Sequence, residues 1–117
     1  MLSDTDVLAF GDVVLVPFPF TDQSGVKRRP AVVISAALAN DTRPDVILMP
    51  ITSQTREQAG GRDLMVGAWS EAGLLKPSAI KPVMATLERA LILRRLGLLQ
   101  AVDRDALRRA LAALIGG

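Results

Sequence analysis

The chain has 117 residues, half of them hydrophobic, which predicts a single domain over residues 1–117 with one core. It contains no cysteine and no histidine, which removes most options for a zinc site or a thiol nucleophile and makes a Ser-His-Asp triad impossible. The formal charge is only +2 although the sequence pI is about 9.7, so evidence for a nucleic-acid partner must come from local clusters of cations.

The N-terminal segment shows no targeting signal. Its first six residues are acidic rather than basic and include no long apolar stretch. No later apolar run approaches the roughly 20 residues that cross a membrane. We therefore expect a cytoplasmic protein that does not insert into a membrane.

Short strands separated by turn residues occupy most of the chain. The first is rich in β-branched side chains and is bounded by glycine and proline. The segment after the fifth strand fits a helical turn or a short strand equally well. In chain order, the predicted strands are residues 11–17, 31–36, 46–51, 63–66 and 78–87, with Pro82 marking an edge or a bulge in the last, and the ambiguous segment is 89–99.

A helix is predicted at the C-terminal end. Asp103 can cap it, and leucines recur at helical spacing on one face while arginines take the other. These residues are Leu107, Leu111 and Leu114 on the first face, and Arg104, Arg108 and Arg109 on the second. Several strands followed by one helix indicate a mainly β, α+β fold: a small, strongly curved barrel or sheet with a helix packed on it.

A basic cluster, Lys27-Arg28-Arg29, ends the predicted loop of residues 18–29. Pro30 restricts Arg29 to extended geometry, so the Arg29 side chain leaves the chain in a defined direction. A guanidinium held in this way offers a planar set of donors that suits phosphate oxygens. The alternative is a solvated turn whose cations only aid solubility.

Two adjacent hydroxyls, Thr52 and Ser53, follow the third predicted strand. Beside Arg29, one of them could donate to an oxygen of a phosphorane and stabilise its charge without a metal. Alternatively, they belong to a turn in which the hydroxyls satisfy nearby backbone groups.

Carboxylates and aromatic rings supply further candidates. Any carboxylate near the basic cluster could act as a general base, although each could equally be a surface charge. Phe18 and Phe20 alternate around Pro19 and could stack on bases, or they could anchor the base of the loop in the core. The carboxylates are Asp22, Glu57, Asp63 and Glu88.

Four stretches together resemble the MazF/PemK family of toxins from type II toxin–antitoxin modules. They run in order over residues 11–116 and are similar to the family's Gly-Asp strand and Arg-Pro corner, its third strand, its Gly-Leu segment and its closing helix. In this chain they read GDVVLVPFPFTDQSGVKRRPAVVIS, VILMPITSQ, AGLLKPSAIKPVMATL and LGLLQAVDRDALRRALAALIG.

This resemblance implies a compact SH3-like β-barrel with a C-terminal helix, assembled as a homodimer. It also implies an endoribonuclease that needs no metal or other cofactor and cuts single-stranded RNA or mRNA, commonly at short sequences. In such enzymes the RNA 2′-hydroxyl attacks its own phosphodiester and leaves a 2′,3′-cyclic phosphate and a 5′-hydroxyl. A cognate antitoxin would block the RNA groove with an acidic segment.

By position, the resemblance makes Arg29 the phosphate binder and the charge stabiliser or acid, with Thr52 as its partner. Ser53 and Asp22 are secondary catalytic candidates. Some members carry a glutamate a few residues before the arginine, where this chain has Ser24, so no general base is assigned. The remaining candidates contact RNA, and they are Lys27, Arg28, Phe18, Phe20 and Gln54.

Two other functions remain open. A CcdB-like gyrase poison would use the C-terminal helix and tail, although the tail ends in Leu114-Ile115-Gly116-Gly117 without an aromatic anchor. A catalytically degenerate member would only bind RNA or an antitoxin.

Overall fold

The protein is a mostly β, α+β domain, as expected from its strand pattern. The computed structural model describes residues 7–18, 27–55, 57–58 and 61–116. Its elements are β1 (Asp12–Phe18), β2 (Lys27–Val33), α1 (Ala37–Thr42), β3 (Asp45–Ser53), β4 (Leu64–Met65), β5 (Ser78–Ile80), β6 (Ala85–Glu88), the 3₁₀ helix η1 (Arg89–Leu91), β7 (Arg94–Leu98) and α2 (Ala101–Leu114).

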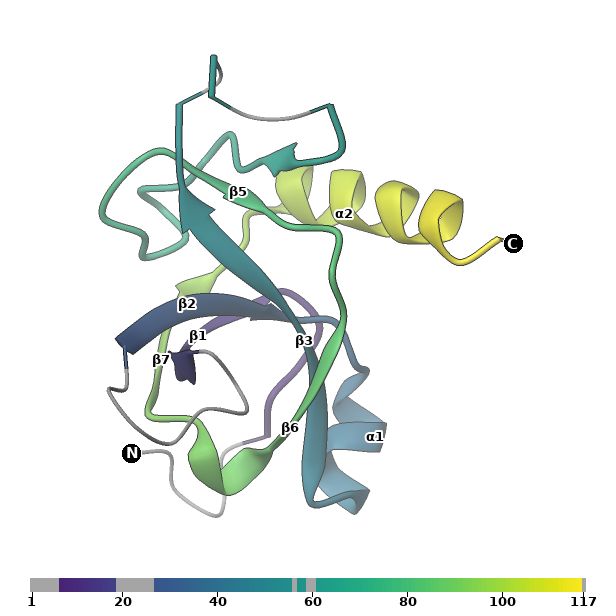
Figure 1. Ribbon diagram of the computed structural model, residues 1–117. Helices are drawn as coiled ribbons and strands as arrows, with labels where there is room; N and C mark the ends of the chain where they lie inside the picture. Colours follow the sequence, from purple (N-terminus) through teal and green to yellow (C-terminus); the bar gives the residue numbers. More distant parts are fainter. Residues whose placement is uncertain (1–6, 19–26, 56, 59–60, 117) are drawn as a thin grey trace.

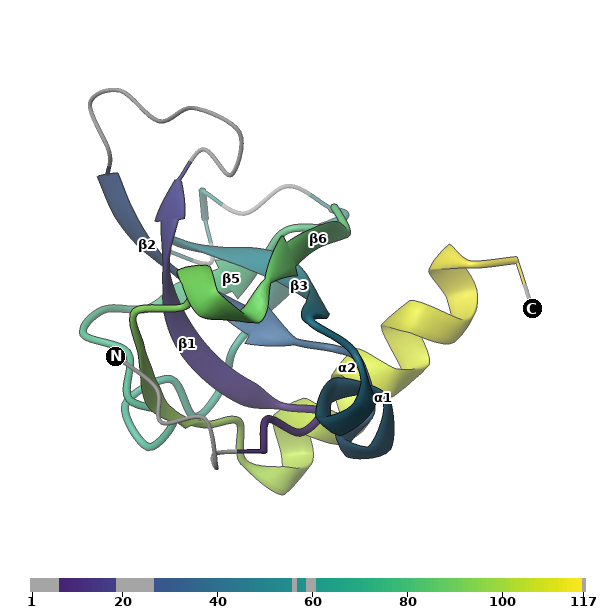
Figure 2. The same cartoon turned by 90° about the horizontal axis from the view of Figure 1, so that it is seen from below.

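The strands form one antiparallel sheet in the order β4-β5-β3-β2-β1-β7, and β6 pairs with the first half of β3. The long strand β3 crosses the molecule, and its two halves belong to two parts of the sheet (Figure 1). Seen from below, α2 extends away from the strands at one side (Figure 2). Among the described residues no hydrogen-bonded pair joins β4 to β7, so the strands do not close into the expected barrel.

Alternation along the strands divides the core into two clusters. Val13, Val32 and Met49 belong to one cluster, which Leu107 of α2 completes. The residues that follow these in each strand point to the other face of the sheet. Val14, for example, is fully buried in the second cluster. Because both faces of the central strands are covered, these strands are continuously apolar rather than alternating. No helix in the described ranges has the length and apolarity needed to cross a membrane.

The basic cluster lies within a strand, not at the end of a loop as expected. Lys27 pairs with Phe18, and the antiparallel ladder between β1 and β2 continues from there to Val32. The β2–β3 ladder is shorter and stops at the pair Ala31↔Pro50. Pro30 has no N–H with which to extend that ladder, so β2 and β3 separate beyond it. Figure 1 shows their ends diverging.

Three other segments differ from the sequence expectation or resolve it. The predicted turn after the second strand contains the short helix α1, where the buried Asn40 donates to the carbonyl of Leu8 over 2.6 Å. The fifth predicted strand is divided into β5 and β6, with Pro82 at the break. The ambiguous segment contains both of the predicted alternatives, first η1 and then β7.

Asp103 does not cap its own helix. The helix begins at Ala101, its N-cap Gln100 makes no side-chain cap, and the Asp103 carboxylate accepts hydrogen bonds from the backbone N–H groups of Gly67 and Ala68, both at 2.9 Å. A buried carboxylate in the first turn is also favoured by the helix dipole. Asp103 therefore fixes the start of α2 to the segment that follows β4.

We expect Asp103→Ala to lower the free energy of unfolding by about 2–4 kcal/mol, because two backbone N–H groups lose a charged acceptor that is itself buried. Asp105→Ala is the matched control on the same helix. Its carboxylate is exposed and, within the described residues, forms an ion pair only with Arg108, so its loss should change stability by less than about 0.5 kcal/mol. Urea denaturation of both variants measures the difference, and equal stabilities would contradict the role given to Asp103.

Two glycines bring the segment before β5 against β7. A Cβ on Gly73 would lie 2.2 Å from the carbonyl oxygen of Leu96, and a Cβ on Gly97 would lie 2.3 Å from that of Ala72. Gly73 also has φ +88°, a conformation that side chains rarely adopt. Backbone packing therefore joins β7 to residues 72–74 where strand pairing does not.

Candidate functional site

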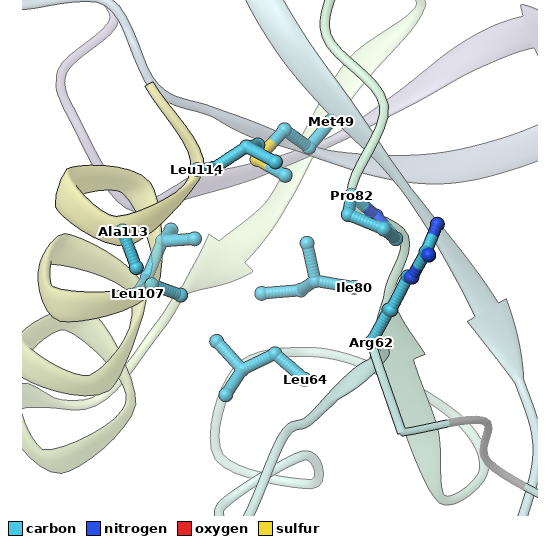
Figure 3. Close-up of a pocket in the computed structure, with 9 residues that line it drawn as sticks. Met49, Arg62, Leu64, Ile80, Pro82, Leu107, Ala113 and Leu114 are labelled. Atoms are coloured by element: carbon cyan, nitrogen blue, oxygen red, sulfur yellow. The ribbon is translucent and has the colours of Figure 1, made fainter. Parts of the chain in front are cut away.

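One cavity of the protein is apolar. It has a volume of about 470 Å³ and lies between α2 and the β4–β5 part of the sheet (Figure 3). Its walls include Leu64, Ile80 and Leu107, and Arg62 is the one charged side chain among its described lining residues. This cavity offers no set of groups that could act on a phosphodiester, so size alone does not identify the site.

A second cavity, of about 320 Å³, lies where β2 and β3 separate. Among the described residues, four cations contribute to its wall and no carboxylate does. Two hydroxyl residues, Ser53 and Ser78, also line it, and the Ser78 hydroxyl donates to the carbonyl of Lys76 over 2.7 Å. The four cations are Arg28, Arg29, Lys76 and Arg94. We call this cavity the basic cleft.

Arg29 and Thr52 lie on neighbouring strands at the same end of the sheet. The last β2–β3 pair is Ala31↔Pro50, and the same register continued for two residues puts Arg29 level with Thr52 and Arg28 level with Ser53. Alternation assigns Arg29 and Thr52 to one face of the sheet and Arg28 and Ser53 to the other. Arg29, Arg28 and Ser53 line the basic cleft, whereas Thr52 does not.

The Thr52 hydroxyl has no hydrogen-bond partner among the described residues, although its oxygen is buried. It therefore does not satisfy a backbone group there, as the turn hypothesis required. A buried, unsatisfied hydroxyl costs about 1–3 kcal/mol. Such an atom gains a partner if a ligand oxygen reaches it, which requires the groups that cover it to move.

The cations of the basic cleft have no counterion among the described residues. None of the four forms an ion pair within the described part of the chain, whereas Lys81 and Arg95 pair with Asp63 and Asp12. Lys27, exposed opposite Phe18 at the end of β1, extends the same positive edge. Uncompensated cations that share one cleft repel one another and attract an anion.

The candidate carboxylates that the structure describes are not placed to act as a general base in the cleft. Asp63 accepts from Lys81 at 2.8 Å and from the Gln54 side chain at 2.7 Å, so it is already committed. Glu88 lies opposite Asp45 in the ladder between β6 and β3. Asp45 is seven residues from Thr52 along β3, which corresponds to about 23 Å at ~3.3 Å per residue. Glu57 does not line the cleft, and the candidates Asp22 and Phe20 lie outside the described residues.

Lys76 and Arg94 are cleft residues to which sequence reasoning gave no role. Both are exposed, and Lys76 is a lone cation in its segment, whereas Arg94 is followed by Arg95 in a segment that could not be assigned to a helix or a strand. The sequence signal that could have indicated Lys76 is its place in the Gly-Leu-Leu-Lys stretch. In the structure, this stretch begins at Gly73, whose backbone lies close to Leu96. Within the described ranges, no group of three or more His, Cys, Asp or Glu side chains is close enough to hold a metal ion.

Comparison with known proteins agrees with the fold. A chain of MazE–MazF from Deinococcus radiodurans is 24% identical, with a TM-score of 0.74 over 95% of this chain and 98% of that one. The Mycobacterium tuberculosis toxin MazF-mt6 is 20% identical, with a TM-score of 0.72 over 90% and 96%. An endoribonuclease in complex with its cognate antitoxin, from a mycobacterial species, is 17% identical, with a TM-score of 0.73 over 96% of each chain. At these identities the likeness establishes the fold alone.

Sequence comparison establishes the family. The search of curated proteins gives no significant match. A family model described as "PemK-like, MazF-like toxin of type II toxin-antitoxin system" matches residues 9–115, nearly the whole chain. The chain therefore belongs to the PemK-like, MazF-like toxins of type II toxin–antitoxin systems.

Proposed function

We propose that this toxin is an endoribonuclease that cleaves single-stranded RNA or mRNA at the edge of the sheet where β2 begins and β3 ends. The observation that carries the proposal is that Arg29 and Thr52 lie on adjacent strands at the same end of the sheet, beside a cleft to which the described residues contribute four cations and no carboxylate. Membership in the toxin family and the likeness to a mycobacterial endoribonuclease support it. Cleavage of mRNA would arrest translation and growth.

In the proposed reaction the RNA supplies its own nucleophile. The 2′-oxygen loses its proton and bonds to phosphorus, and the bond from phosphorus to the 5′-oxygen breaks as that oxygen gains a proton. The Arg29 guanidinium donates to the non-bridging oxygens, where negative charge develops, and the Thr52 hydroxyl donates a further hydrogen bond. Lys27 and Arg28 hold the neighbouring backbone. The products are a 2′,3′-cyclic phosphate and a 5′-hydroxyl.

The protein is expected to cleave a long single-stranded RNA in the presence of excess EDTA, because the proposed groups need no metal. Mapping the fragment ends should show 5′-hydroxyls at recurrent short sequences. The Arg29→Ala protein, purified in parallel, controls for contaminating nucleases. Intact RNA together with inhibited DNA supercoiling would instead support a gyrase poison, and intact RNA that is still bound would support a degenerate member.

We propose two protein partners for the same surface. The Deinococcus and mycobacterial relatives include structures of MazE–MazF and of an endoribonuclease with its cognate antitoxin. A cognate antitoxin with an acidic segment would neutralise the unpaired cations of the basic cleft and so exclude RNA. A homodimer would place two such clefts along one RNA groove.

A further inference from the structure

The basic cleft has a second group of cations on a different face from Arg29 and Thr52. In the sheet register, Leu15 pairs with Pro30 on one side and with Arg94 on the other. Side chains of directly paired residues share a face, so Arg94 lies on the face of Pro30 and therefore of Arg28, two residues earlier. Arg94 and Arg28 thus flank Leu15 on the face opposite to that of Arg29.

Lys76, in the segment before β5, lines the same cleft as Arg28 of β2 and Arg94 of β7. It follows the segment that Gly73 and Gly97 hold against β7, where neither glycine has room for a Cβ. Its carbonyl is held by the Ser78 hydroxyl at 2.7 Å. The backbone that carries Lys76 is therefore fixed relative to the strand that carries Arg94.

The group also has an apolar neighbour suited to the other parts of a nucleotide. Leu75, which lines the cleft beside Lys76, is 92% exposed. The cleft volume of about 320 Å³ is at the lower end of ligand cavities, which span roughly 300–1,000 Å³. An exposed leucine next to unpaired cations matches a nucleotide, whose phosphate is anionic and whose base and sugar present apolar surface.

We propose that Arg28, Lys76 and Arg94 form a second phosphate subsite, which binds the linkage next to the one that is cut, while Leu75 contacts the adjoining base or sugar. The inference rests on the proposed RNA-cleaving function and extends it. The subsite contributes binding and register, and Arg29 and Thr52 act on the scissile linkage. It predicts that the enzyme needs an RNA longer than the reacting dinucleotide.

The test measures binding of a short, mixed-sequence RNA that is fully 2′-O-methylated and so cannot be cleaved. Arg94→Gln and Lys76→Gln are each expected to weaken binding several-fold, and each should reduce the slope of log K against log salt by about 0.7, the value for one lost contact with single-stranded RNA. Arg109→Gln is the control, because Arg109 is also an exposed arginine, lies on α2 and does not line the cleft. Thermal unfolding should be the same for all three variants.

A second measurement locates the subsite. Neutral methylphosphonates are placed at one linkage at a time in the same RNA, which contains a mapped cleavage sequence. A methylphosphonate at one of the linkages adjacent to the cleaved position should weaken binding by the parent protein. The same substitution should not weaken binding by Arg94→Gln any further. If the difference in binding between the parent and Arg94→Gln disappears when the cleaved linkage itself is neutral, and not when a neighbouring linkage is, the subsite is overturned.

The outcomes separate the two proposals. If the parent cleaves RNA but Arg94→Gln and Lys76→Gln bind and cleave like the parent, or like Arg109→Gln, the subsite is wrong and the proposed function stands. If the parent neither binds nor cleaves RNA, both proposals are wrong.

Discussion

Replacing Arg29 with alanine is expected to reduce RNA cleavage by about 100-fold to 1,000-fold, the usual loss when one donor to a developing negative charge is removed. The half-buried Arg29 side chain has no ion pair in the described part of the chain, so little stability depends on it. Its free energy of unfolding should therefore change by less than about 1 kcal/mol. Cleavage rates and urea denaturation of the same preparation measure both effects.

Arg29→Lys and Arg109→Ala are the controls for this result. The lysine keeps the positive charge but loses the planar set of donors, so its activity should lie between those of the parent and Arg29→Ala. Arg109→Ala removes a charge from α2, outside the cleft, and should cleave like the parent. If Arg29→Ala cleaves RNA and arrests growth as the parent does, the site assignment is wrong.

Thr52→Val is expected to have opposite effects on activity and stability. Valine has nearly the shape of threonine and removes only the hydroxyl, whose oxygen is buried and finds no partner among the described residues. Stability should therefore stay the same or rise by about 1 kcal/mol, because an unsatisfied polar group is lost. Cleavage should fall by roughly 10-fold to 1,000-fold if that hydroxyl donates to the reacting phosphate.

Thr52→Ser and Ser53→Ala test whether cleavage depends on the Thr52 hydroxyl itself or only on the shape of the residues around it. Serine restores the donor and should recover most of the activity, although it loses a methyl group from the core. Ser53→Ala probes the neighbouring hydroxyl, which faces the basic cleft. Parental turnover by Thr52→Val would show that Thr52 is a structural residue. If Ser53→Ala loses all activity while the Thr52 variants keep theirs, the catalytic hydroxyl is that of Ser53.

Features that depend on neighbours in the chain could be read from the sequence. The β-branched run in β1 and the apolar run in β3 predict buried strands whatever their partners are. The leucine spacing in α2 likewise predicts the face on which Leu107 is buried. The order of these elements, with the four stretches that resemble the toxin family, leads to the correct fold class and family.

Features that depend on distant partners could not be read in the same way. Lys27, Arg28 and Arg29 have the composition of a loop, and they are strand residues because β1 supplies a ladder for them. Asp103 has the position of a helix cap, but its hydrogen bonds go to Gly67 and Ala68, more than thirty residues away. Local propensity is too small to oppose such tertiary contacts.

The same division holds for the candidate site. The sequence by itself determined that an arginine rigidified by a following proline, and a hydroxyl at the end of an apolar strand, are available for a phosphate. Only the tertiary structure decided that Arg29 and Thr52 lie on neighbouring strands at the same end of the sheet, and that Lys76 and Arg94 join Arg28 at one cleft. The reason is physical: strand register and the close backbone contact at Gly73 and Gly97 bring together cations from segments that carry no common pattern.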